Sequence, residues 1–593
     1  MLNLNVMKKF RIIILAMVAA AALSSCQDSL DLRSNGTIDM SEVFQDRNRT
    51  RGYLNACYNY LKAPYVHAGA YTDDAQNSES ITAGHGFDIW YNSDVTSSNF
   101  AASNLDGNPW GQFFQGVRKC NVFIANIDGA TAEITNEERA GWKAQALTLR
   151  AWYYLQLMKR FGQLPLITSD LGTSHDYTAD KKASVSEIAA QIFADCDAAI
   201  ATEDSDAYSY VYRTQQWGMA TKALAQAIRC ETATYVISPL FSDGGYTADQ
   251  ALDIAADALA KVLANDYSLW TTASGGYNAY ASYFLYNPDD YRAKDKETIF
   301  GGVRTTVWKE CGLPIVSGSS TAGTCPTQEL VDAYEMANGK PAITGYSDEQ
   351  HLKPIINTES GYDESKPYEN RDPRFYATVF YNGSSRGNDE ISTVAGANCG
   401  LNATSIRYTH TGYYMRKFAH DASNRNSNSD GYMRGVRLAE LYYNFAEVAY
   451  QAVGPDKVVS VSGLNLSARD AVNKVRARVN MPGIPSGLSV SDFEKRYRND
   501  RRVEFALEPD RYFSLRRWKA LSSTAVVSGV KVSGTGKNIT YERFSFDKRM
   551  TCSDKYLLYP LELSEASKIL ELTGNDWQNP GWYIADEPTS ALD

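Results

Sequence analysis

The chain has few of the residues that metal and nucleotide chemistry require in fixed patterns. Its six histidines are scattered through 593 residues without an H-E-x-x-H motif, so a zinc metalloprotease is disfavoured. Its nine cysteines form no C-x-x-C pair, which disfavours a zinc ribbon. No G-x-x-x-x-G-K-[ST] phosphate loop occurs, which disfavours a P-loop nucleotidase. These absences favour binding over catalysis.

Long hydrophobic runs are also missing after the start of the chain. A helix needs about 20 apolar residues to cross a bilayer, and no later segment provides them. The early apolar run Ile12–Leu23 is too short for a stable span. Three basic residues precede this run, and Leu23-Ser24-Ser25-Cys26 ends it, an order typical of a lipoprotein signal peptide. We therefore expect a signal peptide over residues 1–25.

The mature chain is expected to begin at Cys26, which would carry the lipid, with residues 26–39 as a polar tether. Firm anchoring would need more than one acyl chain. The signal peptide contains three basic residues and no acid, so its removal changes the formal net charge from −10 to −13. An acidic surface argues against nucleic acid or anionic lipid as the main partner.

Tyrosine is abundant, with 39 copies beside 10 Trp and 21 Phe. Aromatic rings suit the CH-rich faces of sugars, and the tyrosine hydroxyl adds hydrogen bonding. Most of these rings are nevertheless expected to pack between helices.

Amphipathic helical patterns dominate the sequence, and three of them begin with a capping box. The fold class predicted is mainly α, with stacked helical pairs of the tetratricopeptide type. The expected helices are Met40–Leu61, Trp110–Ile127, Thr135–Phe161, Ser184–Ile200, Thr214–Ile237, Thr247–Asn265, Val436–Val453, Leu466–Val479 and Asp492–Leu507.

The middle of the chain differs, because residues 267–325 and 340–434 are rich in Gly, Ser, Asn, Asp and Tyr. Long functional loops and a few short strands are expected there, including a strand over Tyr376–Tyr381. Gly383–Gly387 fits G-x-S-x-G, but no helix pattern follows it, so a turn between extended segments is predicted. The expected division is an N-terminal helical region at 40–266 and a loop-rich C-terminal region at 267–593.

Eight stretches along the chain form one ordered set of motifs. They are CQDSLD at 26–31, KAQALTLRAWYYLQLMKRFGQLPLI at 143–167, PTQELVDAYEMANGK at 326–340, RDPRFYATVFYNG at 371–383, RLAELYYNFAEVAYQA at 437–452, AVNKVRARVNMPG at 471–483, RRVEFALEPDRYFSLRRWK at 501–519 and WQNPGWY at 577–583. In this order they resemble the SusD/RagB lipoproteins of Bacteroidetes nutrient-uptake systems. Leu507-Glu508-Pro509 departs from the family's Glu-Gly pair, and ten extra residues trail the end.

The resemblance implies a tetratricopeptide-like helical scaffold with a loop-rich ligand site and no enzymatic activity. It also implies a surface-exposed lipoprotein of the outer membrane. Such a protein would bind glycan and act as a lid on a SusC-like TonB-dependent transporter.

The expected ligand contacts lie in two aromatic loop segments, 71–110 and 277–308, because aromatic side chains in loops can stay exposed and available to a ligand. The family's position for binding residues, just before the second helix, falls in the first segment. Tryptophans within helical patterns are expected in the core instead: Trp142, Trp152, Trp217 and Trp518. The predicted ligand residues are Trp90, Asn92, Asp73, Tyr286 and Arg292.

No catalytic residue, metal site or cofactor is predicted, and several alternatives stay open. A structural calcium could be held by loop oxygens such as Asp289 and Asp290. A disulfide between Cys311 and Cys325 is permitted by export. Cys57, Cys120, Cys196 and Cys230 are expected to pack as small apolar residues. The functional alternatives are a binder of peptide or another nutrient, a surface glycoside hydrolase, and a structural lid without its own ligand.

Overall fold

The computed structural model describes residues 39–62, 67–103, 105–172, 174–211, 218–285, 294–304, 312–419, 432–546 and 548–582. Seven of the predicted site, disulfide, calcium and core residues lie outside these ranges: Cys26, Trp217, Tyr286, Asp289, Asp290, Arg292 and Cys311. The predicted signal peptide and all but the last residue of the predicted tether fall outside them as well.

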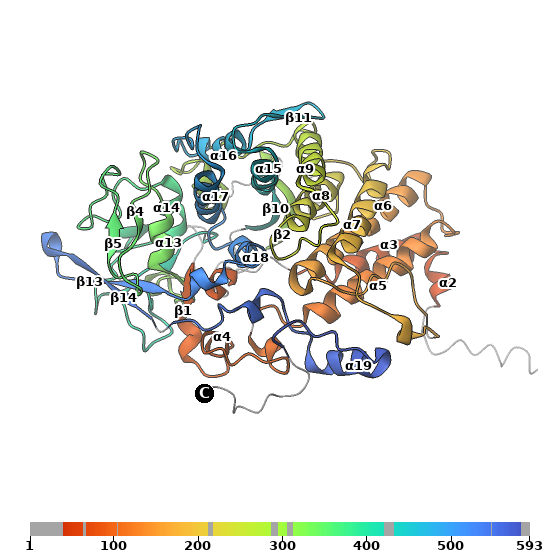
Figure 1. Cartoon of the computed structure of the whole chain (residues 1–593), viewed down its shortest axis with the longest axis horizontal. Coiled ribbons are helices and arrows are strands. Elements are labelled where there is room, and N and C mark those ends of the chain that lie inside the picture. The colour runs from red at the N-terminus through yellow and green to blue at the C-terminus, as the bar shows by residue number, and fades with distance from the viewer. Residues whose placement is uncertain are drawn as a thin grey trace, which may run out of the picture.

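Successive helices stack side by side in a row along one part of the molecule (Figure 1). Each helix packs against the next one in the row, and α15 continues the row after α9. This arrangement confirms the mainly α prediction. The helices of the row are α2 (Met40–Val43), α3 (Arg47–Tyr58), α5 (Pro109–Ile127), α6 (Asn136–Phe161), α7 (Val185–Ile200), α8 (Lys222–Val236), α9 (Ala248–Leu263), α15 (Leu438–Val453) and α16 (Ala468–Ala477).

The predicted capping boxes begin α6, α7 and α9. At the start of α6 the Glu138 N–H donates to Thr135 Oγ1 at 3.1 Å, and the Thr135 N–H donates to Glu138 Oε2 at 3.2 Å. The single helix predicted over Met40–Leu61 is wrong. Asp46 accepts a hydrogen bond from the Arg49 N–H at 2.8 Å and so starts a new helix after a break.

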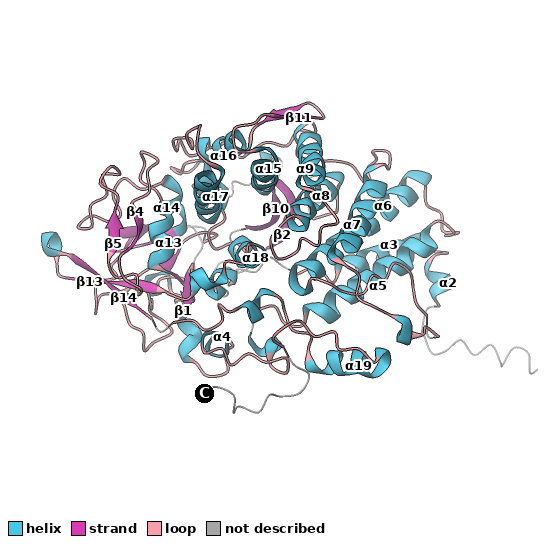
Figure 2. Cartoon of the chain, in the orientation of Figure 1, coloured by secondary structure: helices cyan, strands magenta, loops and turns pink. Residues whose placement is uncertain are grey.

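Short helices, loops and hairpins form the rest of the chain, and Figure 2 shows most of the strands grouped away from the helical row. The helices here are α4 (Phe87–Tyr91), α10 (Ala279–Leu285), α13 (Gln328–Ala333), α14 (Pro373–Thr378), α17 (Val490–Glu504), α18 (Asp510–Arg517) and α19 (Leu563–Thr573). The antiparallel strand pairs are β1 (Ala75–Asn77) with β3 (Thr324–Pro326), β2 (Thr298–Arg304) with β10 (Tyr432–Arg437), β4 (Ile343–Tyr346) with β5 (Pro354–Ile356), β6 (Val379–Phe380) with β9 (Tyr414–Met415), β7 (Ser384–Arg386) with β8 (Asp389–Ile391), β11 (Val459–Val461) with β12 (Leu464–Leu466), and β13 (Ser528–Ser533) with β14 (Thr540–Ser545).

The strand predicted over Tyr376–Tyr381 is mostly wrong. Asp372 caps a helix whose first residue is Pro373, and the chain becomes extended only at Val379–Phe380. The G-x-S-x-G stretch lies in the β7–β8 hairpin, where its middle residues Ser384–Arg386 form strand β7 and only its end glycines lie in turns. The predicted turn over the whole stretch is therefore wrong, although a strand and not a helix follows it.

One hydrophobic core runs across the predicted boundary at residues 266 and 267. Helix α15 of the second region packs against α8 and α9 of the first, and α16 packs against α15. In α15 four apolar residues at helical spacing form a buried stripe: Leu438, Leu441, Phe445 and Val448. The division into two regions stays a prediction from sequence.

A buried network of charges joins the C-terminal elements to one another. Glu504 on α17 is fully buried and accepts hydrogen bonds from Arg437 at 2.8 Å and from Arg374 at 3.2 Å. Arg478 also bonds to it. The three guanidiniums come from α14, β10 and the C-cap of α16, so a single carboxylate holds three chain segments against α17.

The four cysteines predicted to pack as apolar residues are all buried free thiols: Cys57, Cys120, Cys196 and Cys230. Cys325 is a buried free thiol too, and its predicted disulfide partner lies outside the described ranges. Within the described part of the chain, every helix is too short or too polar to cross a bilayer.

Candidate functional site

Trp90, one of the predicted ligand residues, is buried in the structure. Its side chain is 1% exposed and lies edge-on to Tyr71 and to Tyr556, with ring centroids 5.4 Å apart in each pair. The prediction of an exposed ring is wrong, because α4 turns this face of the segment toward the core. A buried ring has no free face on which a sugar could stack.

Asp73 is also buried, and its carboxylate is committed to two arginines. Arg511 Nη2 lies 2.8 Å and Arg502 Nη2 lies 3.1 Å from Asp73 Oδ2. Burial alone would raise the pKa of Asp73, but the two guanidiniums outweigh it and hold the pKa well below its usual range. The carboxylate therefore serves an ion-pair cluster, which corrects its prediction as a ligand contact.

Asn92 is the one predicted ligand residue that the structure shows exposed. It follows α4 as the C-cap, and Ser93 after it adopts a left-handed φ of 63°. A left-handed φ is strained for residues other than glycine, and such strained residues often cluster at ligand-binding and active sites. The other two predicted contacts, Tyr286 and Arg292, lie outside the described ranges, so the structure does not show whether they join Asn92.

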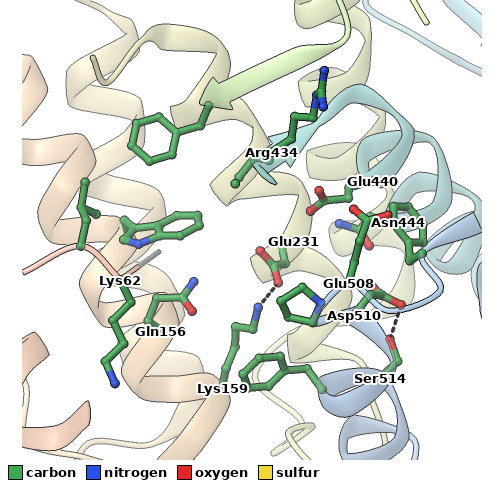
Figure 3. Close-up of a pocket in the computed structure, with 18 of the residues that line it drawn as sticks. Lys62, Gln156, Lys159, Glu231, Arg434, Glu440, Asn444, Glu508, Asp510 and Ser514 are labelled. Atoms are coloured by element: carbon green, nitrogen blue, oxygen red, sulfur yellow. Dashed lines mark hydrogen bonds and ion pairs between the residues drawn. The ribbon is translucent and has the colours of Figure 1, made fainter. Parts of the chain in front are cut away.

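A central cavity of about 490 Å³ lies where the helical row meets the C-terminal helices. Helices α6 and α8 form one part of its wall, α15 and α18 another, and β2 and β10 a third. Figure 3 shows Gln156 and Lys159 on one side of this cavity and Glu440 and Asn444 on the other, with Glu231 between them. A volume of this size falls within the usual range for small-molecule sites.

Aromatic side chains form much of the cavity wall. Trp152 on α6 was predicted to be a core residue but is partly exposed where it lines the cavity, whereas Trp142 and Trp518 are buried as predicted. The other rings in the wall are Tyr58, Phe113, Tyr235, Phe300, Phe505 and Phe513.

Most of the acidic groups in the wall have a cationic partner. Lys159 Nζ lies 2.6 Å from Glu231 Oε1, and Arg501 Nη2 lies 2.5 Å from Asp510 Oδ1. Asp106 pairs with Arg160 and with Lys62, and Glu508 pairs with Arg437 and Lys417.

Glu440 is the exception, because it has no ion-pair partner among the described residues. Its Oε1 accepts a hydrogen bond from the Arg437 N–H at 3.1 Å, which caps α15. Burial and the nearby carboxylates of Glu231 and Glu508 raise the pKa of Glu440 to about 8, against the opposing charge of Arg437.

Two carboxamides turn their NH₂ groups toward the cavity. Gln156 Oε1 accepts from Arg160 Nη1 at 2.9 Å, and Asn444 Oδ1 accepts from Arg501 Nη1 at 2.9 Å. Because a guanidinium holds each amide oxygen, each amide nitrogen is directed away from it. Gln156 is 7% exposed and Asn444 is 3% exposed, and neither nitrogen has a hydrogen-bond partner among the described residues.

This cavity combines flat rings, amide donors and one unpaired carboxylate, which is the chemistry that recognises a small polar molecule. The sequence analysis did not find it. A signal was present in α15, where Glu440, Asn444 and Glu447 recur at i, i+4 and i+7 beside the buried apolar stripe. The described residues contain no group of three or more His, Cys, Asp or Glu side chains placed to hold a metal ion.

Two family models match this chain. Residues 268–582 match the SusD family, and residues 31–228 match a family described as starch-binding and associating with the outer membrane. The first match covers more than half of the chain, so the chain belongs to the SusD family. A comparison with curated proteins finds none that matches.

Solved structures share the fold over nearly the whole chain. A SusD-like protein from Bacteroides fragilis is 23% identical with a TM-score of 0.70, covering 92% of this chain and 99% of its own. A SusD-like carbohydrate-binding protein from the same species is 20% identical with a TM-score of 0.65, covering 90% and 99%. A laminarin-binding SusD-like protein is 18% identical with a TM-score of 0.53, covering 91% and 100%.

Proposed function

We propose that this protein is a surface lipoprotein of the outer membrane that captures glycan and passes it to a SusC-like TonB-dependent transporter. The observation that carries the proposal is the pair of family matches, one described as starch-binding, which together span most of the chain. Solved relatives described as carbohydrate-binding and laminarin-binding support the same ligand class.

We place the polysaccharide contacts on the loop surface that carries Asn92, together with Tyr286 and Arg292. The exposure of Asn92 beside a left-handed backbone position supports its part in this site. An amide offers both a donor and an acceptor to sugar hydroxyls, and a ring and a guanidinium would complete the contacts. Each contact with sugar is weak, so several must act together.

Binding of glycan is tested by calorimetry with the purified protein against soluble plant and algal polysaccharides, with a peptide mixture as the comparison. We expect binding to at least one polysaccharide and none to the peptides. Asn92→Ala should weaken that binding about three- to tenfold, the value of one hydrogen bond. Binding to peptides but to no polysaccharide would contradict glycan capture and would support the alternative, a binder of peptide or another nutrient.

The cell-surface location has its own test. Mass spectrometry of the mature protein should find acyl chains on Cys26, and Cys26→Ala should release the protein from the outer membrane. A non-acylated protein that stays in the membrane fraction would contradict the lipid anchor.

A surface glycoside hydrolase is a second candidate, and one observation favours it. Glu440, with a pKa of about 8, shares the cavity with the carboxylate of Glu231, and a protonated acid beside an ionised one is the arrangement of a glycosidase. The ion pair between Glu231 and Lys159 opposes this role, since it occupies the carboxylate. Release of reducing sugar by the wild type but not by Glu440→Gln would establish hydrolysis.

A further inference from the structure

Five acidic side chains line the central cavity, and four of them have a cationic partner. Glu440 is the one without such a partner among the described residues. Its neighbours Glu231 and Glu508 are also acidic, and the cation that opposes them, Arg437, is itself paired with Glu504 and Glu508. A bound ammonium group would give Glu440 a partner of its own and would favour its ionised form.

The two amide nitrogens described above give the cavity a second, independent feature that points to a ligand. Gln156 and Asn444 are each more than nine-tenths buried, and each NH₂ group faces the cavity without a partner among the described residues. Neither nitrogen is among the fully buried, unsatisfied atoms of the described residues, so both are reached from the cavity and can donate to acceptor oxygens of a molecule bound there. They lie on opposite sides of the cavity (Figure 3), so one small molecule between them could accept from both.

The aromatic wall narrows the ligand class further. Trp152 is partly exposed to the cavity, on the same face of α6 as Gln156 one turn later. An indole face stacks on the CH groups of a sugar ring and also attracts a cation. A molecule with hydroxyl oxygens, an apolar ring face and an ammonium group would use every one of these features.

We propose that the central cavity is a separate internal site for an amine-bearing monosaccharide. The ammonium group would pair with Glu440, ring or hydroxyl oxygens would accept from Gln156 and Asn444, and the sugar would pack against Trp152. This site is distinct from the loop surface around Asn92 and does not depend on polysaccharide binding there.

Calorimetry of the purified protein with D-glucosamine, D-glucose and N-acetyl-D-glucosamine tests the proposal, because these sugars share a ring and differ in the ammonium group. We expect glucosamine to bind at least tenfold more tightly than the other two. Glu440→Gln should remove that preference, a loss of about ten- to a hundredfold for glucosamine. Glutamine also accepts the capping hydrogen bond of α15, so this variant keeps the helix start.

Two further variants control the result. Asn444→Ala should weaken glucosamine and glucose alike, since it removes a donor to oxygen. Glu571→Gln, at an exposed acid on α19, should change neither. Equal affinity for glucosamine and glucose, no binding of glucosamine, or an unchanged preference in Glu440→Gln would each overturn the proposal. Polysaccharide binding is measured on the same variants. If the wild type binds glucosamine but no polysaccharide, the internal site stands and the glycan-capture proposal fails.

Discussion

Trp90 and Asn92 lie two residues apart, yet the fold gives them opposite environments. Trp90 fills the space between Tyr71 and Tyr556, whereas Asn92 is exposed at the end of α4. Trp90→Ala should lower the free energy of unfolding by about 3–5 kcal/mol, because it leaves a large cavity. Asn92→Ala should change it by less than about 0.5 kcal/mol.

Urea unfolding and calorimetry with a bound polysaccharide separate these two effects. Trp90→Phe, which keeps most of the packing, should retain glycan affinity, whereas Asn92→Ala should lose part of it. Glycan affinity that falls in a well-folded Trp90→Phe protein would show that the tryptophan contacts ligand after all.

The pKa of Glu440 makes the stability of this protein depend on pH. The pKa is about 8 in the folded protein and near its ordinary value of 4.5 in the unfolded chain, so the folded state binds more protons between these values. Stability from this group is present at low pH and is lost as the pH rises through about 8. The facing groups are Glu231 from α8, in its pair with Lys159, and Glu508, with Arg437 opposing them.

Glu440→Gln should remove this dependence. Its thermal midpoint should match the wild type at pH 5 and exceed it by about 1 °C or more at pH 9. Scanning fluorimetry from pH 5 to pH 9 measures the difference, with Glu571→Gln as the exposed control. Parallel curves for wild type and Glu440→Gln would show that Glu440 titrates normally.

At the scale of elements, local sequence signals predicted helix starts well. Thr135 and Glu138 are three residues apart, and that spacing alone fixes the reciprocal hydrogen bonds that begin α6. The segment Tyr376–Tyr381 shows the limit of such patterns. A short alternation in this segment suggested a strand, but Asp372 and Pro373 start a helix that continues through Thr378. The helix-capping residues before the segment therefore decided its structure.

Long-range ion pairs could not be predicted from local pattern at all. Glu504 bonds to Arg374, which is 130 residues away in the sequence, and to Arg437, which is 67 residues away. No local spacing relates these residues. The same holds for the cavity, whose wall combines α6 with α15. Local sequence patterns therefore predicted the helical scaffold, but they did not predict the burial of Trp90 and Asp73 or the place of Glu440 in the cavity wall.

The Glu504 network leads to a stability prediction for α17. Glu504→Gln removes a buried negative charge and leaves three guanidiniums short of a partner, so it should lower the free energy of unfolding by about 3–5 kcal/mol. Urea unfolding measures the loss. Glu359→Gln, which removes only a surface partner of Lys340, should leave the urea midpoint unchanged. A midpoint unmoved by Glu504→Gln would mean that Asp372, Asp500 and Glu297 hold the arginines without it.

At the scale of the whole molecule, α15 continues the helical row that the N-terminal region begins. Its buried residues Leu441 and Phe445 belong to the same core as Leu252 and Leu259 of α9, although about 180 residues separate the helices along the chain. A fragment that ends at residue 266 would expose the faces of α8 and α9 that α15 covers. Exposed apolar surface of this kind removes much of the driving force for folding.

We therefore expect residues 26–266, expressed alone, to unfold without a sharp cooperative transition and to bind a hydrophobic dye, whereas the complete mature chain should unfold cooperatively. The cavity walls come from both sides of residue 266, so the fragment should also fail to bind glucosamine. Addition of residues 267–593 as a separate chain should restore cooperativity if the two parts find each other. A fragment that unfolds as sharply as the complete chain would instead establish the two regions as independent domains, with the cavity a space between them and not part of a common core.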